Sequence, residues 1–264
     1  MALHYGQLFK AAKTNLPLVN DEDATDDTIS PEFNNTDYEE AVKKLRNGKA
    51  PGKNGIRAEI IKAGGPILRE KLLDVFNDCW VNGKPIPREW IDAEVISIYK
   101  NRGARKDPNN YRSIFLLDVV GKLYASMAVN RLRTLSQPTL QDTQFGFRNN
   151  RSAEQAILCV RSVIQKAKDA GSSLVLVFVD LTKAFDTVPK EAIFKKLLDL
   201  KCPKNLFSAF SQLMDAVKGH LQDSDSDFTM ERGVRQGSKE DPILFNLVVE
   251  DVLAAARNEL DCGI

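Results

Sequence analysis

The part of this sequence best suited to chemistry is a run of six apolar residues, 174–179, that ends on Asp180. Such a run cannot alternate between a buried and an exposed face, so it predicts a strand that is covered on both sides. Asp180 then emerges at the carboxyl end of the strand, where open α/β sheets hold their sites. A buried carboxylate is costly unless a cation or several donors compensate its charge. The run therefore indicates a metal ligand at Asp180, and a helix cap is the alternative that these residues leave open.

Positive charge is concentrated upstream of this run. The whole chain of 264 residues has a net charge of only +1, but residues 43–112 carry 16 Lys and Arg against 8 Asp and Glu. A basic segment of this kind suits a polyanionic partner. Ordinary solvated helix faces give a similar count, so the charge alone does not decide between the two interpretations.

Two strands with a polar loop between them are predicted inside the basic segment. Residues 93–100 alternate between apolar and polar side chains, residues 101–110 are rich in Gly, Asn and cations, and residues 111–117 form a second strand-like run. This pattern is typical of a β-hairpin. It places Lys100 and Arg112 on the two strands of one basic β-ribbon, residues 93–117.

The remaining periodicity is mainly helical, which gives a mixed α+β class. Apolar residues recur at helical spacing in residues 72–80, 119–132, 153–164, 193–198, 206–217 and 242–255, and a short helix is predicted near residues 38–46. These stripes are expected to face a core. Residues 1–36 are polar and acidic, which predicts a flexible lead-in before a fold that begins near Asp37. The Gly-rich loop at residues 47–55 lacks the spacing of a Walker phosphate loop.

Composition excludes several classes of protein. The four cysteines are too far apart for a CxxC zinc site or a disulfide framework. The first ten residues lack the apolar core of a signal peptide, and no apolar run reaches the ~18 residues that cross a bilayer. We therefore expect an intracellular protein, cytoplasmic or nuclear, with no membrane partner.

Four short blocks occur in a recognisable order. They are Tyr111-Arg112-Ser113-Ile114, Gln144-Phe145-Gly146-Phe147-Arg148, Phe178-Val179-Asp180 with Phe185-Asp186, and Gly233-Val234-Arg235-Gln236-Gly237 with Leu244-Phe245-Asn246. Together they resemble the reverse transcriptase domain of non-LTR (LINE-type) retrotransposons. The resemblance implies an α+β right-hand polymerase fold with fingers in residues 37–165, a partial palm in residues 166–264 and no thumb. It also implies an RNA template, a DNA primer and deoxynucleoside triphosphates as partners.

The resemblance assigns roles to individual residues. Asp180 matches the family's first catalytic, metal-binding aspartate, and the backbone carbonyl of Leu181 is implied as a further oxygen ligand for Mg²⁺ in two-ion nucleotidyl transfer. Nucleotide binding is implied for Lys100, Arg112, Phe185, Gln236 and Gly237. Contact with the nucleic acid is implied for Phe147, Arg148 and Arg235.

Each of these roles has a chemical reason. The guanidinium of Arg112 matches phosphate oxygens in a two-pronged contact, and Lys100 adds a point charge. The ring of Phe185 would reject a 2′-hydroxyl, and Gly237 would let the backbone approach closely. A core aromatic at Phe185, a surface lysine at Lys100 and a plain turn at residues 145–148 are the alternatives.

The chain also departs from the family pattern. The second catalytic block, an aromatic-Ala-Asp-Asp turn, does not occur in the 264 residues. With Asp180 as the one matched carboxylate two ions cannot be held, so we expect no polymerase activity from this chain alone. Residues 174–179 then become an open apolar edge that favours aggregation. Glu240 and Asp241 place negative charge near Gln236, where it would repel a phosphate.

Three functions stay open at this point. The chain is a fragment of an RNA-directed DNA polymerase, a non-catalytic nucleic-acid-binding remnant that uses its basic segment, or a domesticated module that recruits a protein through its exposed edge. Binding to primer-template that falls steeply with salt distinguishes the second from the third. The pattern makes no prediction of oligomeric state.

Overall fold

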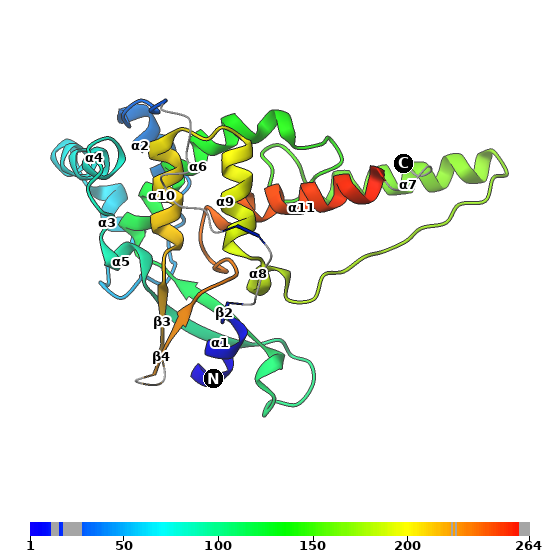
Figure 1. Cartoon of the computed structure of the whole chain (residues 1–264), viewed down its shortest axis with the longest axis horizontal. Coiled ribbons are helices and arrows are strands. Elements are labelled where there is room, and N and C mark those ends of the chain that lie inside the picture. The colour runs from blue at the N-terminus through cyan, green and yellow to red at the C-terminus, as the bar shows by residue number, and fades with distance from the viewer. Residues whose placement is uncertain (12–15, 18–27, 223, 225, 259–264) are drawn as a thin grey trace.

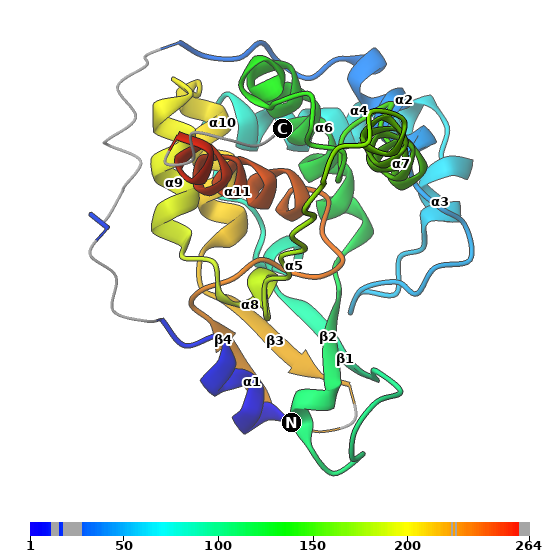
Figure 2. The same ribbon diagram turned by 90° about the vertical axis from the view of Figure 1, so that its right-hand side faces the viewer.

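The computed structural model describes residues 1–11, 16–17, 28–222, 224 and 226–258 (Figure 1). Most of the helices lie above a four-stranded sheet, which forms the lower part of the molecule in Figures 1 and 2, and α1 lies beside the sheet. The mixed α+β class is confirmed. Among the described residues, no helix is both long and apolar enough to span a bilayer.

The sheet has the strand order β2-β1-β3-β4. β1 (Ala93–Tyr99) and β2 (Tyr111–Leu116) pair antiparallel, so the predicted basic β-ribbon is confirmed. β3 (Val217–Leu221) runs parallel to β1, and β4 (Asp227–Met230) runs antiparallel to β3. These last two strands were not predicted, because their short segments carry Gly, His and Asp and lack a strong apolar alternation.

The helices follow in two groups. The first group is α1 (Ala2–Leu8), α2 (Asn35–Lys43), α3 (Ala58–Ala63), α4 (Pro66–Trp80), α5 (Arg88–Ile91) and α6 (Val119–Ser136). The second group is α7 (Ala153–Asp169), α8 (Ala184–Thr187), α9 (Lys190–Asp199), α10 (Lys204–Met214) and α11 (Asp241–Asn258). Short 3₁₀ turns cover Pro108–Asn110 and Gln137–Thr139.

The core is built around α6, which contacts α2, α5, α10 and α11. The helix begins at Asp118, whose carboxylate accepts hydrogen bonds from the backbone N–H of Val120 (2.7 Å) and Gly121 (3.0 Å). Tyr124 lies fully buried among the rings of Trp90 and Phe76, at centroid distances of 5.6 and 5.7 Å. The predicted core stripes of residues 72–80 and 119–132 therefore meet in this aromatic cluster.

The N-terminal segment corrects one expectation. Residues 1–11 do not form a flexible lead-in: α1 packs on β4, and Tyr5 of the helix and Phe9 just after it are buried. The ring of Phe9 stacks on Phe228 at 5.8 Å, and the hydroxyl of Tyr5 donates to Ser97 Oγ at 3.0 Å. Two aromatic residues four positions apart lie on one helical face, which explains why this short segment covers the sheet. Residues 12–15 and 18–27 of the predicted lead-in lie outside the described residues.

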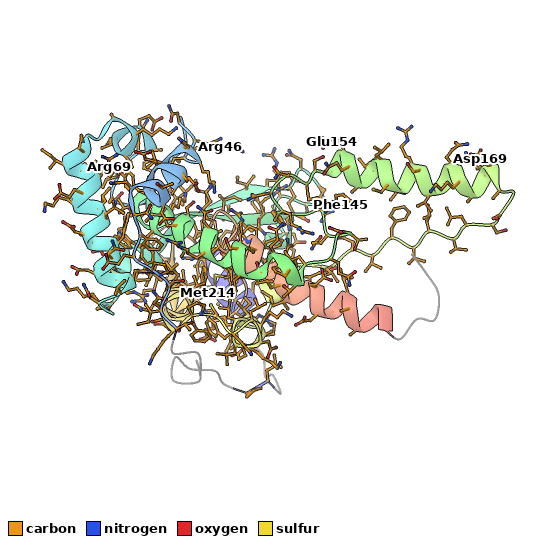
Figure 3. All side chains as sticks on the ribbon, turned by 90° about the horizontal axis from the view of Figure 1, so that it is seen from above. Arg46, Arg69, Phe145, Glu154, Asp169 and Met214 are labelled. Carbon is orange, nitrogen blue, oxygen red and sulfur yellow. The ribbon has the colours of Figure 1, made fainter. Side chains whose placement is uncertain are left out.

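Two further expectations are wrong in residues 153–182, which we call the arm. Figures 1 and 3 show α7 projecting from the body, with Glu154 close to it and Asp169 at the far end, while the following segment returns alongside. Residues 174–179 are not a buried strand; Val175 is 82% exposed and Phe178 is 86% exposed. Ile157 of the predicted core stripe on α7 is likewise 57% exposed. No strand among the described residues lies beside this run, and β-propensity without a hydrogen-bonding partner does not make a sheet.

Candidate functional site

One cavity of about 770 Å³ lies between the basic β-ribbon and the end of the arm. Its walls come from the ribbon, from residues 179–186, from the loop before α11 and from α1. Six of the residues selected from the sequence line it together: Lys100, Arg112, Asp180, Leu181, Phe185 and Gln236. Segments more than a hundred positions apart in the chain are thus brought to one place.

The floor of the cavity is a tight turn at residues 180–187. Lys183 adopts the left-handed backbone conformation, with φ of 53°. Its carbonyl accepts hydrogen bonds from Asp186 N (2.9 Å) and from Thr187 Oγ1 (3.0 Å), and these bonds begin α8. The turn therefore presents Asp180, Lys183 and Phe185 to the same space.

The loop of residues 233–237 holds this turn against the sheet. Gly233 N donates to Val188 O at 2.8 Å, and Val234 N donates to Phe185 O at 2.7 Å. On the other side, Phe115 N donates to Gln236 O at 2.9 Å, which fixes Gln236 at the cavity.

The backbone of Gly237 makes a close contact, as predicted, but its partner in the structure is the backbone of Phe115 and not a nucleotide. Its φ is 129°, and a Cβ atom at this position would lie 2.6 Å from Phe115 O. The glycine thus allows the loop to approach β2. Contact between Gly237 and a nucleotide stays a prediction.

Cations outnumber carboxylates on the ribbon side of the cavity. Burial lowers the pKa of Lys100, and the neighbouring charges of Arg102, Lys183 and Arg112 lower it further, while Asp186 opposes them. Both Lys100 Nζ (3.0 Å) and Lys183 Nζ (2.7 Å) donate to Asn109, the first to its carbonyl and the second to its side-chain oxygen. The surface formed in this way suits an anion.

Asp186 supplies a carboxylate that sequence reasoning quoted without giving it a role. Burial raises its pKa, and the charges of Lys100 and Lys183 act in the opposite direction. Its Oδ1 atom is buried and accepts no hydrogen bond within the described part of the chain. An oxygen in this state is suited to a ligand that enters the cavity.

The oxygen donors at the cavity fit a divalent cation in chemical type. Asp180 is exposed there, with the backbone of Leu181 next to it and the unpaired oxygen of Asp186 in the same wall. Mg²⁺ is commonly held by one or two carboxylates together with substrate phosphates and water. Over residues 1–11, 16–17, 28–222, 224 and 226–258, no group of three His, Cys, Asp or Glu residues forms a complete metal site.

Phe185 and Phe245 line the cavity, and Phe147 packs behind them against Phe185. Phe185 stacks on Phe245 with a centroid distance of 4.4 Å and an interplanar angle of 19°, and Phe147 meets it edge-on at 5.9 Å. The ring of Phe185 is therefore both a wall of the cavity and a packed aromatic. Phe147 is 56% exposed, so one side of it is open to a partner.

Arg148 has internal partners in the structure. Its guanidinium donates to Gln141 O at 2.6 Å and to Gln144 O at 3.4 Å, and Asn246 Nδ2 donates to Gly146 O at 2.6 Å. These bonds shape the loop and tie it to α11. They match the plain-turn alternative, and contact between Arg148 and nucleic acid stays a prediction.

The role implied for Arg235 does not fit the structure, because its side chain is turned into the protein and not toward a template phosphate. Its side chain is 2% exposed and forms ion pairs with Glu240 and Asp241, and its Nη1 donates to Ile91 O at 3.1 Å. Glu240 and Asp241 are buried as well, so they are not surface charges beside Gln236. Burial and the charge of Glu240 raise the pKa of Asp241. The Arg-Glu-Asp network fixes the start of α11 in place of contacting a ligand.

Two further cavity residues were missed by sequence reasoning. Lys183 lies inside the Asp180 to Asp186 block, and its charge three positions after Asp180 is a signal that could have found it. Asn109 carries no such signal, because an Asn in a polar loop is an ordinary turn residue.

Comparison with known proteins identifies the family of the chain. Residues 100–264 match the family described as reverse transcriptase (RNA-dependent DNA polymerase). The chain is 30% identical, over 85% of its length, to the 115 kDa protein of the type-1 retrotransposable element R1DM of Drosophila melanogaster. It is 28% identical over 81% of its length to the RNA-directed DNA polymerase from transposon BS, and 26% identical over 80% to that from the mobile element jockey, both of the same fly.

The chain spans 22%, 24% and 23% of the length of these three relatives. The family match includes every lining residue from Lys100 to Phe245, so it covers most of the cavity described above. The chain belongs to the reverse transcriptase family and is related to the reverse transcriptases of non-LTR retrotransposons.

Proposed function

We propose that this chain forms the nucleotide-binding and template-binding part of an RNA-directed DNA polymerase active site. In this proposal residues 37–165 act as fingers and residues 166–264 as a partial palm. The observation that carries it is the single cavity in which six residues selected from the sequence lie together. Its ligands are a deoxynucleoside triphosphate, an RNA template and a DNA primer.

The residues divide the work of holding a nucleotide. Arg112 and Lys100 face the triphosphate, because a guanidinium and an ammonium both bind phosphate oxygens well. Phe185 borders the sugar, and its stacking on Phe245 keeps the ring from moving aside for a 2′-hydroxyl. Gln236 adds an amide that can donate to the nucleotide.

Asp180 and the carbonyl of Leu181 would hold Mg²⁺ in this arrangement. The ion, when bound, activates the primer 3′-hydroxyl and neutralises charge on the phosphates. A second ion needs carboxylates like those of the Asp-Asp block, which the 264 residues do not contain. We therefore propose that the chain binds nucleotide through these residues, and that primer extension requires such carboxylates as well.

Titration of the purified chain with dGTP, with and without Mg²⁺, tests the proposal. The wild-type chain is expected to bind dGTP about tenfold more tightly with Mg²⁺, and Asp180→Asn to lose this dependence. Asp199→Asn is the matched control, since Asp199 pairs with Lys195 on α9 away from the cavity. An Asp180→Asn chain with undiminished Mg²⁺ dependence, or a wild-type chain that binds no dGTP, contradicts the proposal.

Nucleic-acid binding without nucleotide binding is the second candidate function. It is favoured by the exposed cations Arg102, Arg105 and Lys106 at the tip of the basic β-ribbon. Contacts of this kind release counterions, so primer-template affinity should fall steeply as salt increases. A chain with that salt dependence and no affinity for dGTP would be a nucleic-acid-binding module.

A further inference from the structure

Lys183 faces the proposed nucleotide cavity and has no role in the function described so far. Its Nζ donates to Asn109 Oδ1 at 2.7 Å, and this bond joins the floor of the cavity to the base of the ribbon loop. Lys100 Nζ donates to the carbonyl of the same asparagine at 3.0 Å. Two ammonium groups from separate segments thus meet on one neutral residue.

Asn109 is oriented for this contact by Asp107. The Oδ1 atom of Asp107 accepts hydrogen bonds from Asn109 N (2.9 Å) and Nδ2 (3.0 Å). With its amide nitrogen engaged in this way, the side-chain oxygen of Asn109 is turned to Lys183. Asn109 satisfies a hydrogen bond of each lysine but neutralises neither charge.

The backbone of Lys183 is held in a conformation that lysine seldom adopts. Its φ of 53° belongs to the left-handed region, where a residue with a Cβ atom is strained. Hydrogen bonds from Asp186 N and Thr187 Oγ1 to its carbonyl maintain it. Strained backbone conformations that neighbouring hydrogen bonds maintain are common at ligand-binding sites. Here the strained turn places Lys183 on the cavity wall.

Charge at this point is unbalanced. Lys100, Arg102, Arg112 and Lys183 all line the cavity. The carboxylates of Asp186 and Asp107 each offset part of the charge of Lys183, and Asp180 lies exposed at the turn. A ligand with several anionic oxygens would satisfy both lysines in charge and in hydrogen bonding, which Asn109 cannot do.

We propose that Lys183 binds the triphosphate of the incoming nucleotide, and that Asn109 holds its ammonium in the nucleotide-free protein and releases it to the phosphates. This inference rests on the proposed function and names a contact within the same site. Lys183, Lys100 and Arg112 would then form a three-cation grip from two sides of the cavity.

Calorimetric titration with dGTP and with inorganic tripolyphosphate tests the inference. Lys183→Met should weaken both ligands about tenfold or more, because a charge-assisted contact is lost while the aliphatic stem remains. Lys183→Arg should bind within about threefold of wild type, since the charge is kept. Lys195→Met, a surface lysine of α9 that pairs with Asp199, is the matched control and should bind like wild type.

Asn109→Ala separates the two parts of the inference. It should bind both ligands at least as tightly as wild type, because the lysine no longer has to leave a partner. Thermal midpoints of all variants show whether they are folded, and Lys183→Gln serves as a second neutral variant if Lys183→Met is destabilised.

The outcomes that overturn the inference are distinct. If wild type binds both ligands and folded Lys183→Met or Lys183→Gln binds them equally well, Lys183 is not a phosphate ligand, and the proposed function stands. If folded Asn109→Ala is weakened as much as Lys183→Met, Asn109 is itself a ligand and not a placeholder. If wild type binds neither dGTP nor tripolyphosphate, the proposed function fails and this inference fails with it.

Discussion

Lys190 is a half-buried ammonium group at the start of α9. Its Nζ donates to Met214 O at 2.6 Å and to Met230 O at 2.9 Å, so one side chain joins the ends of α10 and β4. Burial lowers its pKa from 10.5 to about 8, and the nearby charges of Asp215 and Arg235 act in opposite directions. The folded protein therefore holds this proton less tightly than the unfolded chain does.

This shift predicts a rise in stability at alkaline pH. Between pH 8 and pH 10.5 the unfolded chain keeps the Lys190 proton while the folded protein loses it, so the free energy of unfolding increases with pH. The gain is roughly 3 kcal/mol across this interval. Lys190→Met should lack it, which urea denaturation of both proteins at pH 7.5, 9 and 10 would measure.

The informative quantity is the difference in the free energy of unfolding between wild type and Lys190→Met, because other lysines and tyrosines titrate in the same pH interval. Lys195→Met on the same helix is the control, since Lys195 is exposed and its pKa is raised by its hydrogen bond to Asp199. Parallel pH profiles for wild type and Lys190→Met would show that burial does not perturb Lys190.

At the scale of single elements, the local sequence pattern was sufficient to predict an element whose pairing partner is close to it in the chain. The basic β-ribbon pairs with itself through a short loop, so alternation in residues 93–100 and 111–117 predicted it. The apolar stripe of α6 was wide enough to indicate a core helix. The residues around the cavity came instead from the family resemblance, and their meeting in one place required the structure.

The predictions were wrong for residues whose burial or pairing depends on segments far away in the chain. Residues 174–179 have strong β-propensity but no strand beside them among the described residues, so they stay exposed. Arg235 has the sequence signature of a surface cation, and only the fold buries it with Glu240 and Asp241. Tyr5 and Phe9 lie in a polar stretch whose composition hides two buried rings.

The junction of α8 with the loop before α11 depends on Gly233. Its φ is 81°, and a Cβ atom would lie 2.5 Å from Asp186 O, in the turn that carries Lys183 and Phe185. Gly233→Ala adds both left-handed strain and a clash with backbone, so we expect a loss of about 3 kcal/mol or more in the free energy of unfolding. We also expect weaker dGTP binding, because the cavity floor must shift.

Gly171→Ala is the matched control for this change. Gly171 has a similar φ of 62°, and a Cβ atom there has no neighbour within 4 Å, so only the strain of about 1–2 kcal/mol applies. Urea denaturation of the two variants measures the difference. Equal losses would mean that the turn moves freely and that Gly233 does not fix the cavity floor.

The whole molecule combines a compact body with an arm that packs against little of it. Figure 3 shows the arm extending away from the body along α7. Ile157, Leu158 and Val160 are exposed on α7, and the returning segment exposes Val175, Val177, Phe178 and Val179. An uncharged, proline-free, β-branched run of this length is a template for strand pairing between molecules.

The arm should therefore dominate the self-association of the purified chain. Val177→Lys and Phe178→Lys each place a charge in the middle of the run, which should lower the aggregation rate several-fold without changing the thermal midpoint, because both side chains are about 80% or more exposed. Light scattering against time at several concentrations measures the rate. Val252→Lys is the matched control: Val252 is 62% exposed on α11, outside the run, and its substitution should leave the rate unchanged. If all three variants aggregate at the wild-type rate, contacts of the body and not of the arm bring the molecules together.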